Sequence, residues 1–300
     1  MANSFIKTVY NSSIWYKLVL AFSIVIIYYL YHRKSNNVEG FIQRQKFLIK
    51  EGREIYDPFY ASIYDDLIFD TVRTEYEVGQ ILQSTQPTSQ SLILDVGSGT
   101  GNHVNSFVSK GYNAVGLDVS PPMLEIARRK YPDLEFNIGD VEDVMTYPAH
   151  TYTHITCLNF TIYDIKDKFL FFRNCYEWLK PGGYLTVHLA HNDPVTGQPT
   201  SSVLLSSNNY SKLQNNRSFV RFDNFKYKSK FNIENNNGVF EEVFTDSNGK
   251  VRKNIHTLLM SSQDHIIKLA QDTGFILEGK IDLQPVQYDN QYIYIFYKPE

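Results

Sequence analysis

The stretch Leu94-Asp95-Val96-Gly97-Ser98-Gly99-Thr100-Gly101 decides the fold. It ends the apolar run 92–96, which we predict to be a buried β-strand, and it precedes a helical segment at 102–110. Glycines at such a turn let the backbone bend sharply and approach a ligand without Cβ clashes. The helix beyond would present free N–H groups to that ligand. The stretch therefore predicts a ligand-binding loop between a strand and a helix.

The spacing of the glycines separates two kinds of loop. A dinucleotide fingerprint has the form Gly-x-Gly-x-x-Gly. Counted from Gly97, its third glycine would fall at position 102, which is Asn. The chain has Gly-x-Gly-x-Gly instead, with Asp95 two residues earlier. This pattern favours S-adenosylmethionine over NAD, and a nicotinamide oxidoreductase is the alternative that it disfavours.

Strand-like and helix-like segments alternate around this loop, which predicts an α/β fold with a mostly parallel sheet and helices on both faces. The loop ends in the helix 102–110, and Ser120-Pro121 begins another helix well, with an N-cap serine and a proline in the first turn. We expect seven strands in a Rossmann-like sheet. The expected strands are 92–96, 114–118, 134–138, 153–158, 184–189, 275–282 and 292–298, and the remaining helices are 168–179 and 262–273.

Two aspartates follow the next two expected strands. Asp118 closes the strand 114–118 beside the loop, where a carboxylate can accept hydrogen bonds from both hydroxyls of a ribose. The alternative role for Asp118 is an ordinary cap of the helix that starts at Pro121. Asp140, in Gly139-Asp140-Val141, can accept from an adenine amino group while the next backbone N–H reaches a ring nitrogen. The alternative for Asp140 is a simple turn residue.

These pieces, together with Leu179-Lys-Pro-Gly-Gly-Tyr-Leu185, resemble the class I S-adenosylmethionine-dependent methyltransferases over about residues 55–298. The region 57–76 also resembles the small-molecule branch, which includes glycine and amino-sugar N-methyltransferases. The resemblance implies that Tyr60 or Tyr64 lines the site and that Arg73 pairs with the cofactor carboxylate; a surface helix position is the alternative for Arg73. The implied cofactor contacts are Tyr60, Tyr64, Arg73, Asp95, Gly97, Ser98, Gly99, Gly101, Asp118, Val119, Met123, Asp140, Val141 and Asn159.

Methyl transfer requires in-line positioning of the acceptor and in some cases a base. Candidates follow the fourth and fifth strands, and we name His191 and Tyr163 as catalytic candidates. His191 has a suitable titration range for a base, although a loop histidine is more often surface. His188, inside a strand, is expected to be a hydrogen-bonded core residue. No Cys/His cluster has zinc spacing, so no metal is expected.

The stretch from about 196 to 260 breaks the alternation. Apolar residues of 225–233 alternate with polar ones, as in a half-buried antiparallel strand, and Asn237-Gly238 and Asn248-Gly249 indicate hairpin turns. We expect a small antiparallel insertion that covers the site. The lysines at 226, 228 and 230 would protect a solvated sheet face, or contact an anionic substrate or lipid headgroups.

The most apolar stretch, residues 14–31, predicts one transmembrane helix. Eighteen residues rise about 27 Å, near the thickness of a hydrocarbon core, and aromatic residues lie near both ends. His32-Arg33-Lys34 follow the span, whereas only Lys7 precedes it, so the positive-inside rule places the rest of the chain in the cytosol. The expected layout is 1–34 with the span, a linker at 35–54 and a methyltransferase domain at 55–300.

Composition predicts a folded chain with a sizeable core: 43% of the 300 residues are hydrophobic, and the net charge of −3 gives no basic footprint for nucleic acid. Cys157 and Cys175, the two cysteines, are expected to be inert core thiols. We therefore expect a membrane-tethered methyltransferase that acts on a small molecule, a lipid or a membrane-proximal protein. The alternative is a catalytically inactive methyltransferase fold that serves as an interaction module at a membrane; the oligomeric state is open.

Overall fold

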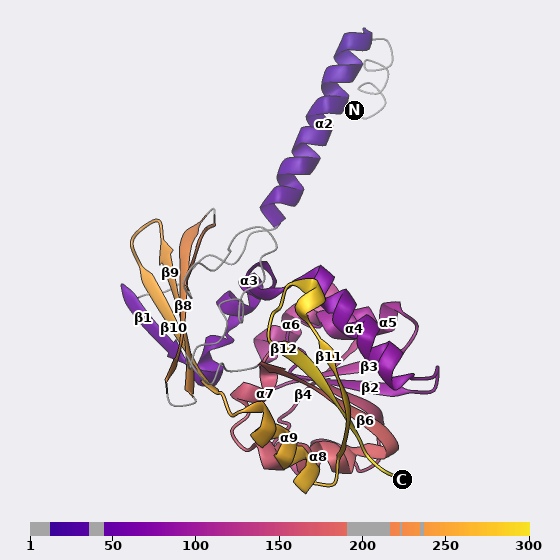
Figure 1. The fold of residues 1–300 in the computed structure, drawn as a ribbon. Helices are drawn as coiled ribbons and strands as arrows, with labels where there is room; N and C mark the ends of the chain where they lie inside the picture. The colour runs from indigo at the N-terminus through magenta and orange to yellow at the C-terminus, as the bar shows by residue number, and fades with distance from the viewer. Residues whose placement is uncertain (1–12, 36–44, 191–216, 223, 235–236) are drawn as a thin grey trace. The chain divides into compact units, whose positions relative to one another are not determined.

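The computed structural model describes residues 13–35, 45–190, 217–222, 224–234 and 237–300. The chain divides into two compact units, Met1–Gly40 and Phe41–Glu300. The larger unit holds two β-sheets with their helices (Figure 1). The smaller unit contains the single described helix α2 (Ile14–Ser35).

The main sheet of the larger unit has seven strands in the order β11-β12-β6-β5-β2-β3-β4. The strands from β6 to β4 run parallel, whereas β12 pairs antiparallel with both β6 and β11. The mostly parallel seven-stranded sheet predicted from the sequence is thus confirmed. Its strands are β2 (Leu92–Val96), β3 (Asn113–Asp118), β4 (Glu135–Ile138), β5 (Tyr152–Cys157), β6 (Leu179–Ala190), β11 (Ile276–Asp282) and β12 (Gln291–Tyr297).

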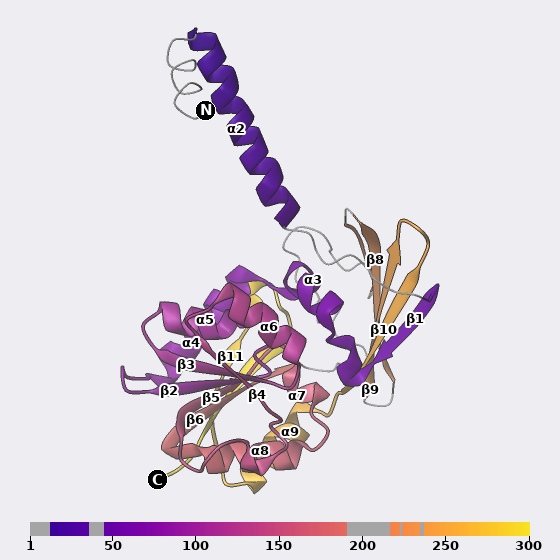
Figure 2. The ribbon, with the colours of Figure 1, turned by 180° about the vertical axis from the view of Figure 1, so that it is seen from behind.

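Helices cover both faces of this sheet, because its central strands are apolar on both sides (Figures 1 and 2). Each face has its own hydrophobic core. In one core Ile93 of the sheet and the helix residue Phe107 are buried, and in the other Leu94 of the sheet and the helix residue Phe172 are buried. The helices of the first core are α4 (Thr71–Thr85), α5 (Asn102–Ser109) and α6 (Pro121–Lys130), and those of the second are α8 (Lys168–Trp178) and α9 (Gln263–Asp272).

Short polar residues begin most of these helices. Ser120 Oγ accepts from the backbone N–H of Met123, as expected of an N-cap serine before Pro121-Pro122. Asp57 caps α3 (Pro58–Ile68) and Asp70 caps α4 in the same way. The remaining short elements are η1 (Gly52–Ile55), η2 (Val144–Thr146), α7 (Thr161–Asp164) and η3 (Gln284–Val286).

The second sheet has five strands in the order β1-β10-β9-β8-β7. Strands β7 to β10 pair antiparallel, as the alternating sequence predicts, and the β9–β10 turn contains Asn248-Gly249. One face is buried through Phe225, Tyr227 and Phe231, while Lys226 and Lys228 are exposed on the other. The strands are β1 (Phe47–Glu51), β7 (Arg217–Arg221), β8 (Phe225–Glu234), β9 (Asn237–Asp246) and β10 (Val251–Leu259).

Strand β1 lies within the stretch 35–54, which the sequence suggested to be a linker. Phe47–Glu51 pairs in parallel with Val251–Ile255 of β10 and so joins the sheet from a distant part of the chain. The sequence FLIKE has too few residues to show a clear period by itself, so the pairing partner decides its conformation. As a result, the stretch just before η1 belongs to the second sheet.

The predicted membrane span is wrong. Among the residues that the structure describes, no helix combines the length and apolarity that crossing a bilayer requires. Helix α2 includes Lys17 near its start and His32-Arg33-Lys34 at its end. The stretch between them, residues 18–31, rises only about 21 Å, short of the roughly 30 Å hydrocarbon core. The membrane location and the cytosolic orientation, which were predicted from residues 14–31, depend on that span and are therefore wrong as well.

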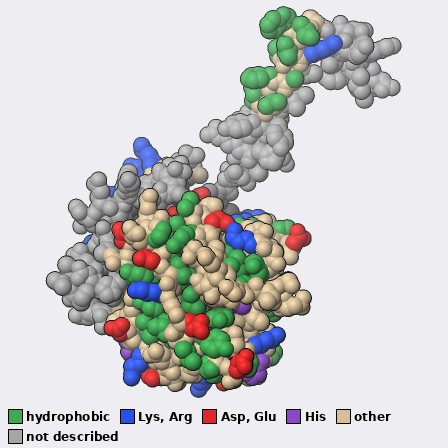
Figure 3. All heavy atoms as spheres, turned by 45° about the vertical axis from the view of Figure 1, so that its right-hand side comes forward, with side chains coloured by type: hydrophobic (Ala, Val, Ile, Leu, Met, Phe, Trp, Pro, Cys, Tyr) green, Lys and Arg blue, Asp and Glu red, His purple; other side chains and the backbone are tan. Residues whose placement is uncertain are grey.

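Charge is well mixed on the surface of the larger unit. On the face drawn in Figure 3, acidic and basic side chains of the described residues are interspersed among apolar ones. Cys157 and Cys175 are free thiols that are fully buried, in β5 and α8, and burial raises the pKa of both. Neutral buried thiols of this kind are inert, in agreement with the sequence.

Candidate functional site

A cavity of about 500 Å³ lies at the carboxyl ends of the strands β2 to β5. Its volume is typical of a site for a small molecule, and ligands of open α/β sheets bind at this edge. The second sheet and η1 close its other side. Lining residues include Arg53, Tyr56, Tyr64, Gly97, Gly99, Asp118, Val119, Met123, Asp140, Val141, Asn159, Thr161, Asp164 and His256.

The glycine loop after β2 borders this cavity. Gly97 has a φ of 70° and Gly99 a φ of 54°, in the left-handed region that favours glycine. A Cβ at Gly97 would overlap the Thr161 side chain, and one at Gly99 would lie 3.3 Å from Met123 Cε. The glycines therefore allow other groups to approach the loop backbone closely, as the sequence suggested.

Asp118 ties this loop to the end of β3. One carboxylate oxygen accepts from the Gly99 N–H at 2.8 Å and the other accepts from the Ser120 N–H at 2.8 Å. Burial raises the pKa of Asp118, and these backbone donors oppose that rise. Because Ser120 itself caps α6, Asp118 is not needed for that purpose. Each of its oxygens keeps acceptor capacity toward the cavity.

Asp140 lines the cavity but is already paired. Its Oδ2 accepts from Arg53 Nη2 at 2.6 Å, and its Oδ1 accepts from the Glu142 N–H at 3.0 Å. Val141, the next residue, lines the cavity as well. An adenine amino group at Asp140 would therefore share the carboxylate with Arg53 or replace it.

A smaller hollow of about 40 Å³ opens beside the loop. Asp95 and Ser98 line it, and Tyr64, Gly97, Gly99 and Asn159 border both spaces. Asp95 is buried and accepts from Thr156 Oγ1 at 2.7 Å, and burial raises the pKa of its carboxyl. Ser98 Oγ is buried and has no hydrogen-bond partner within the described part of the chain.

Four of the predicted site residues do not line these spaces. Tyr60 is buried against Tyr64 and His256, and Gly101 is the N-cap of α5. Tyr163 is fully buried, where its hydroxyl accepts from the Ala190 N–H at 2.9 Å. The fourth, Arg73, takes part in the polar network described next. His191 falls outside the described residues.

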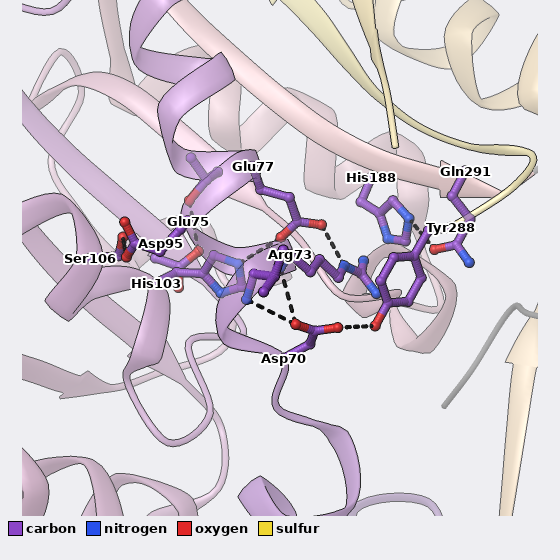
Figure 4. Close-up of polar contacts among 12 residues, drawn as sticks. Asp70, Arg73, Glu75, Glu77, Asp95, His103, Ser106, His188, Tyr288 and Gln291 are labelled. Carbon is purple, nitrogen blue, oxygen red and sulfur yellow. Dashed lines mark hydrogen bonds and ion pairs between the residues drawn. The ribbon is translucent and has the colours of Figure 1, made fainter. Parts of the chain in front are cut away.

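Arg73 belongs to a buried polar network that joins α4 to α5 (Figure 4). Its Nε donates to Glu77 Oε1 at 2.6 Å, and its guanidinium lies over the Tyr288 ring. His103 Nε2 lies 2.9 Å from Glu77 Oε2. The Arg73 and His103 charges lower the pKa of Glu77 to about 2 despite complete burial, and Glu77 in turn raises the pKa of His103.

His188 also supports the site from below. Its Nδ1 accepts from the Phe160 N–H at 3.2 Å, and its Nε2 lies 3.0 Å from Gln291 Oε1. Complete burial lowers the pKa of His188 to about 3, so the ring is neutral. It holds the Asn159–Phe160 turn, where both residues have positive φ, in place beside the cavity. The expected hydrogen-bonded core role of His188 is confirmed.

Several polar residues that line the cavity were not predicted as site residues from the sequence. Tyr56 follows η1, Asp164 ends α7 and His256 lies on β10. Tyr56 OH donates to Asp164 Oδ2 at 3.4 Å, and its ring lies against that of His256. None of the three belongs to a local motif. Only the pairing of the second sheet beside the loop brings them together.

Residues 93–183 match the family model of the methyltransferase domain. Among curated proteins, one relative is the dTDP-4-amino-2,3,4,6-tetradeoxy-D-glucose N,N-dimethyltransferase of Saccharopolyspora spinosa, 34% identical over 144 residues. That match covers 46% of this chain and 57% of the relative. A demethylmenaquinone methyltransferase of Chlorobaculum parvum is 35% identical over 34% of this chain and 43% of its own length. The chain thus spans about half the length of the curated relatives that it matches.

Solved structures extend the likeness to most of the chain. An S-adenosylmethionine-dependent methyltransferase of Clostridium acetobutylicum aligns with a TM-score of 0.62 and 18% identity, over 80% of this chain and 98% of its own. The fold is that of the S-adenosylmethionine-dependent methyltransferases. An amino pentose methyltransferase of Micromonospora echinaspora, solved with S-adenosylmethionine bound, aligns at 0.55 and 17% identity over 75% of this chain and 91% of its own. S-Adenosylmethionine, the cofactor expected from the glycine spacing, agrees with all of these comparisons.

Proposed function

We propose that this chain is an S-adenosylmethionine-dependent methyltransferase that acts on a small molecule. The observation that carries the proposal is the arrangement of Gly97, Gly99 and Asp118 around one cavity at the carboxyl edge of the sheet. The family match over residues 93–183 and the printed activities of the relatives, one of which modifies an amino sugar, support it.

The residues of the cavity fit the expected donor. Gly97 and Gly99 border the cavity and have no Cβ, and Asp118 keeps two acceptor oxygens at the edge where a ribose would lie. Val119, Met123 and Val141 offer an apolar wall for an adenine, with Asp140 at its polar edge. Ser98 and Asp95 in the small hollow would face the methionine end.

Among the cofactor contacts that the resemblance implies, Arg73 is the one whose movement toward the cavity would break a buried ion pair, the one with Glu77. Its guanidinium is held by Glu77, and to reach a carboxylate in the cavity Arg73 would have to leave a buried acid without its strongest partner. Arg73 Nη2 has no hydrogen-bond partner among the described residues. We therefore propose that Arg73 acts on a bound donor through the positive field that it adds beside Glu77 and His103.

When bound, the donor supplies an electrophilic methyl group on a sulfonium, which is already a good leaving group. The task of the chain is then to hold the acceptor in line and to exclude water. The second sheet and η1, which close the cavity opposite the glycine loop, are suited to that task.

Two measurements on the full chain test the proposal. Calorimetry with S-adenosylmethionine and with S-adenosylhomocysteine should show one saturable site. Incubation with methyl-tritiated donor and a small-molecule extract should then transfer label to a product that is separated by chromatography. Donor binding without any transfer would favour an inactive binding module, whereas a lack of binding at millimolar donor would refute the proposal.

A further inference from the structure

A buried carboxylate lies inside the second sheet, next to the cavity. Glu242 of β9 is fully buried, yet three donors from the two neighbouring strands, β8 and β10, converge on it. Tyr227 OH donates to its Oε1 at 2.8 Å, Asn254 Nδ2 donates to its Oε2 at 3.2 Å, and His256 Nε2 lies 2.8 Å from Oε2. Convergent donors are what an ionised carboxylate requires when it is removed from water.

His256 connects this carboxylate to the cavity. Its ring is packed among the aromatic rings of Tyr56, Tyr60 and Phe240, with centroids 5.3–6.0 Å away. The Glu242 carboxylate can only accept, so His256 Nε2 must carry the hydrogen of their bond. His256 Nδ1 is then an acceptor, and it has no hydrogen-bond partner in the described part of the chain. Since His256 lines the cavity, Nδ1 is available to a bound molecule.

The cavity that His256 borders is rich in acidic side chains as a whole. Glu51, Asp118, Asp140, Glu142 and Asp164 line the cavity, against the two basic residues Arg53 and Lys166. Arg53 is already paired with Asp140. The excess negative charge favours a cationic group, and an alkyl amine is cationic near neutral pH. Such an amine cannot act as a nucleophile until it has lost a proton.

We propose that the acceptor is an amine and that His256 Nδ1 takes its proton, with Glu242 as the residue that positions the imidazole. The inference rests on the proposed function. An ammonium R–NH3+ gives one proton to Nδ1, and the resulting imidazolium is balanced by the Glu242 carboxylate. The free electron pair of R–NH2 forms a bond to the methyl carbon, the carbon–sulfur bond breaks, and its electron pair stays on sulfur. His256 then releases its proton to solvent.

A purely structural His–Glu pair is the competing explanation. Glu242 accepts from Tyr227 and Asn254 without any help from His256, so the carboxylate does not need the imidazole to be satisfied. The buried histidines differ in how they use their ring nitrogens: His188 uses both, with Phe160 and Gln291, whereas His154 Nε2 is enclosed without a partner among the described residues. The ring of His256 uses one nitrogen toward the sheet and leaves the other at the cavity.

Several titratable groups face His256. Glu242 from β9 and Asp164 from α7 are the acidic ones, and the Tyr56 and Tyr60 hydroxyls are neutral because burial raises the pKa of both. The His256 charge also lowers the pKa of Asp164, which burial otherwise raises. Glu242 is the one of these acidic groups that is fully buried and hydrogen-bonded to the His256 ring, so a substitution of Glu242 removes the partner that orients the ring.

The test compares His256→Gln and Glu242→Gln with His154→Gln. His154 is a matched control because it is as buried as His256, at 7% exposure, and does not line the cavity. Calorimetry measures donor affinity, and the tritium assay with the small-molecule extract measures transfer across pH. Nitrogen NMR of the histidine-labelled full chain reports which ring nitrogen of His256 carries hydrogen, independently of activity.

We expect His256→Gln to keep the donor affinity within about threefold while transfer falls roughly 100-fold or more, the usual contribution of a positioned base. The wild-type rate should fall on the acid side of neutral, and this limb should be absent in His256→Gln. In Glu242→Gln, NMR should show mixed hydrogen placement between Nδ1 and Nε2, whereas the wild type shows Nε2–H alone. His154→Gln should transfer at nearly the wild-type rate.

Transfer by His256→Gln at the rate of the control would overturn the inference, as would a hydrogen on Nδ1 of the wild-type ring at neutral pH. A labelled product methylated on oxygen or carbon would overturn the amine assignment. If the wild type binds no donor, the proposed function fails first, and this result differs from a variant that binds donor but does not transfer.

Discussion

Glu77→Gln is the substitution that tests the buried network most directly. Glu77 is fully buried between Arg73 and His103, and its pKa lies at about 2 instead of the ordinary 4.5. A change of one pKa unit corresponds to about 1.4 kcal/mol. The lowered pKa therefore means that folding favours the ionised Glu77 carboxylate over its protonated form by roughly 3 kcal/mol. Glutamine keeps the size but leaves the guanidinium without its anion. We expect a loss of about 3–5 kcal/mol in the free energy of unfolding.

Urea denaturation at pH 7 measures that loss, with Glu75→Gln as the matched control. Glu75 lies on the same helix and pairs with Lys110, but it is exposed, so its loss should cost less than about 1 kcal/mol. The wild type should also lose stability as pH falls from about 4.5 toward 2, because a lowered carboxyl pKa stabilises the fold only above that range. Equal losses for Glu77→Gln and Glu75→Gln would refute this account of the network.

Three further outcomes are expected. Asp118→Ala should weaken S-adenosylmethionine binding by about 3 kcal/mol, the value of two charge-assisted hydrogen bonds, and unchanged affinity in calorimetry would exclude the ribose role. Gly97→Ala should reduce donor affinity at least tenfold, because its Cβ would meet Thr161 at a positive φ; the same titration checks this result. His188→Gln should remove much of the stability that the wild type loses as pH falls from about 6.5 to 3. The pKa of buried His188 is lowered to about 3, so over this range only the unfolded chain takes up the proton. Denaturation at several pH values measures this dependence, which would be the same in both proteins if His188 were charged in the fold.

Local patterns were enough to predict the main sheet. The strand 92–96 and the N-cap Ser120 occur where apolar runs and capping residues indicated them, because these signals act over a few neighbouring residues. Strand β1 was missed, since its conformation depends on a partner two hundred positions away. The helix at 14–31 was expected, but Lys17 and His32 shorten the apolar stretch that a membrane span needs.

The sequence indicated the part of the cavity wall that the glycine loop and the strand-end aspartates form, but not the part that the second sheet forms. Glycine spacing and strand-end aspartates form a local motif, so Gly97 and Asp118 could be named from sequence. His256 and Asp164 come from separate elements and carry no spacing rule, so only the tertiary arrangement shows them together. For Arg73 the resemblance implied a ligand contact, and the fold adds a buried partner, Glu77, that the sequence did not indicate.

The parallel pairing of β1 with β10 has a consequence for how the chain is made. Phe47 cannot pair in its sheet until Val251 has been synthesised. At about 5–20 residues per second, a ribosome takes on the order of 10–40 s to synthesise the intervening chain. During that interval the strands β2 to β5, which pair over much shorter distances, can already assemble. We infer that the glycine loop takes shape on the nascent chain first and that the wall carrying His256 is added later, once β10 has been synthesised.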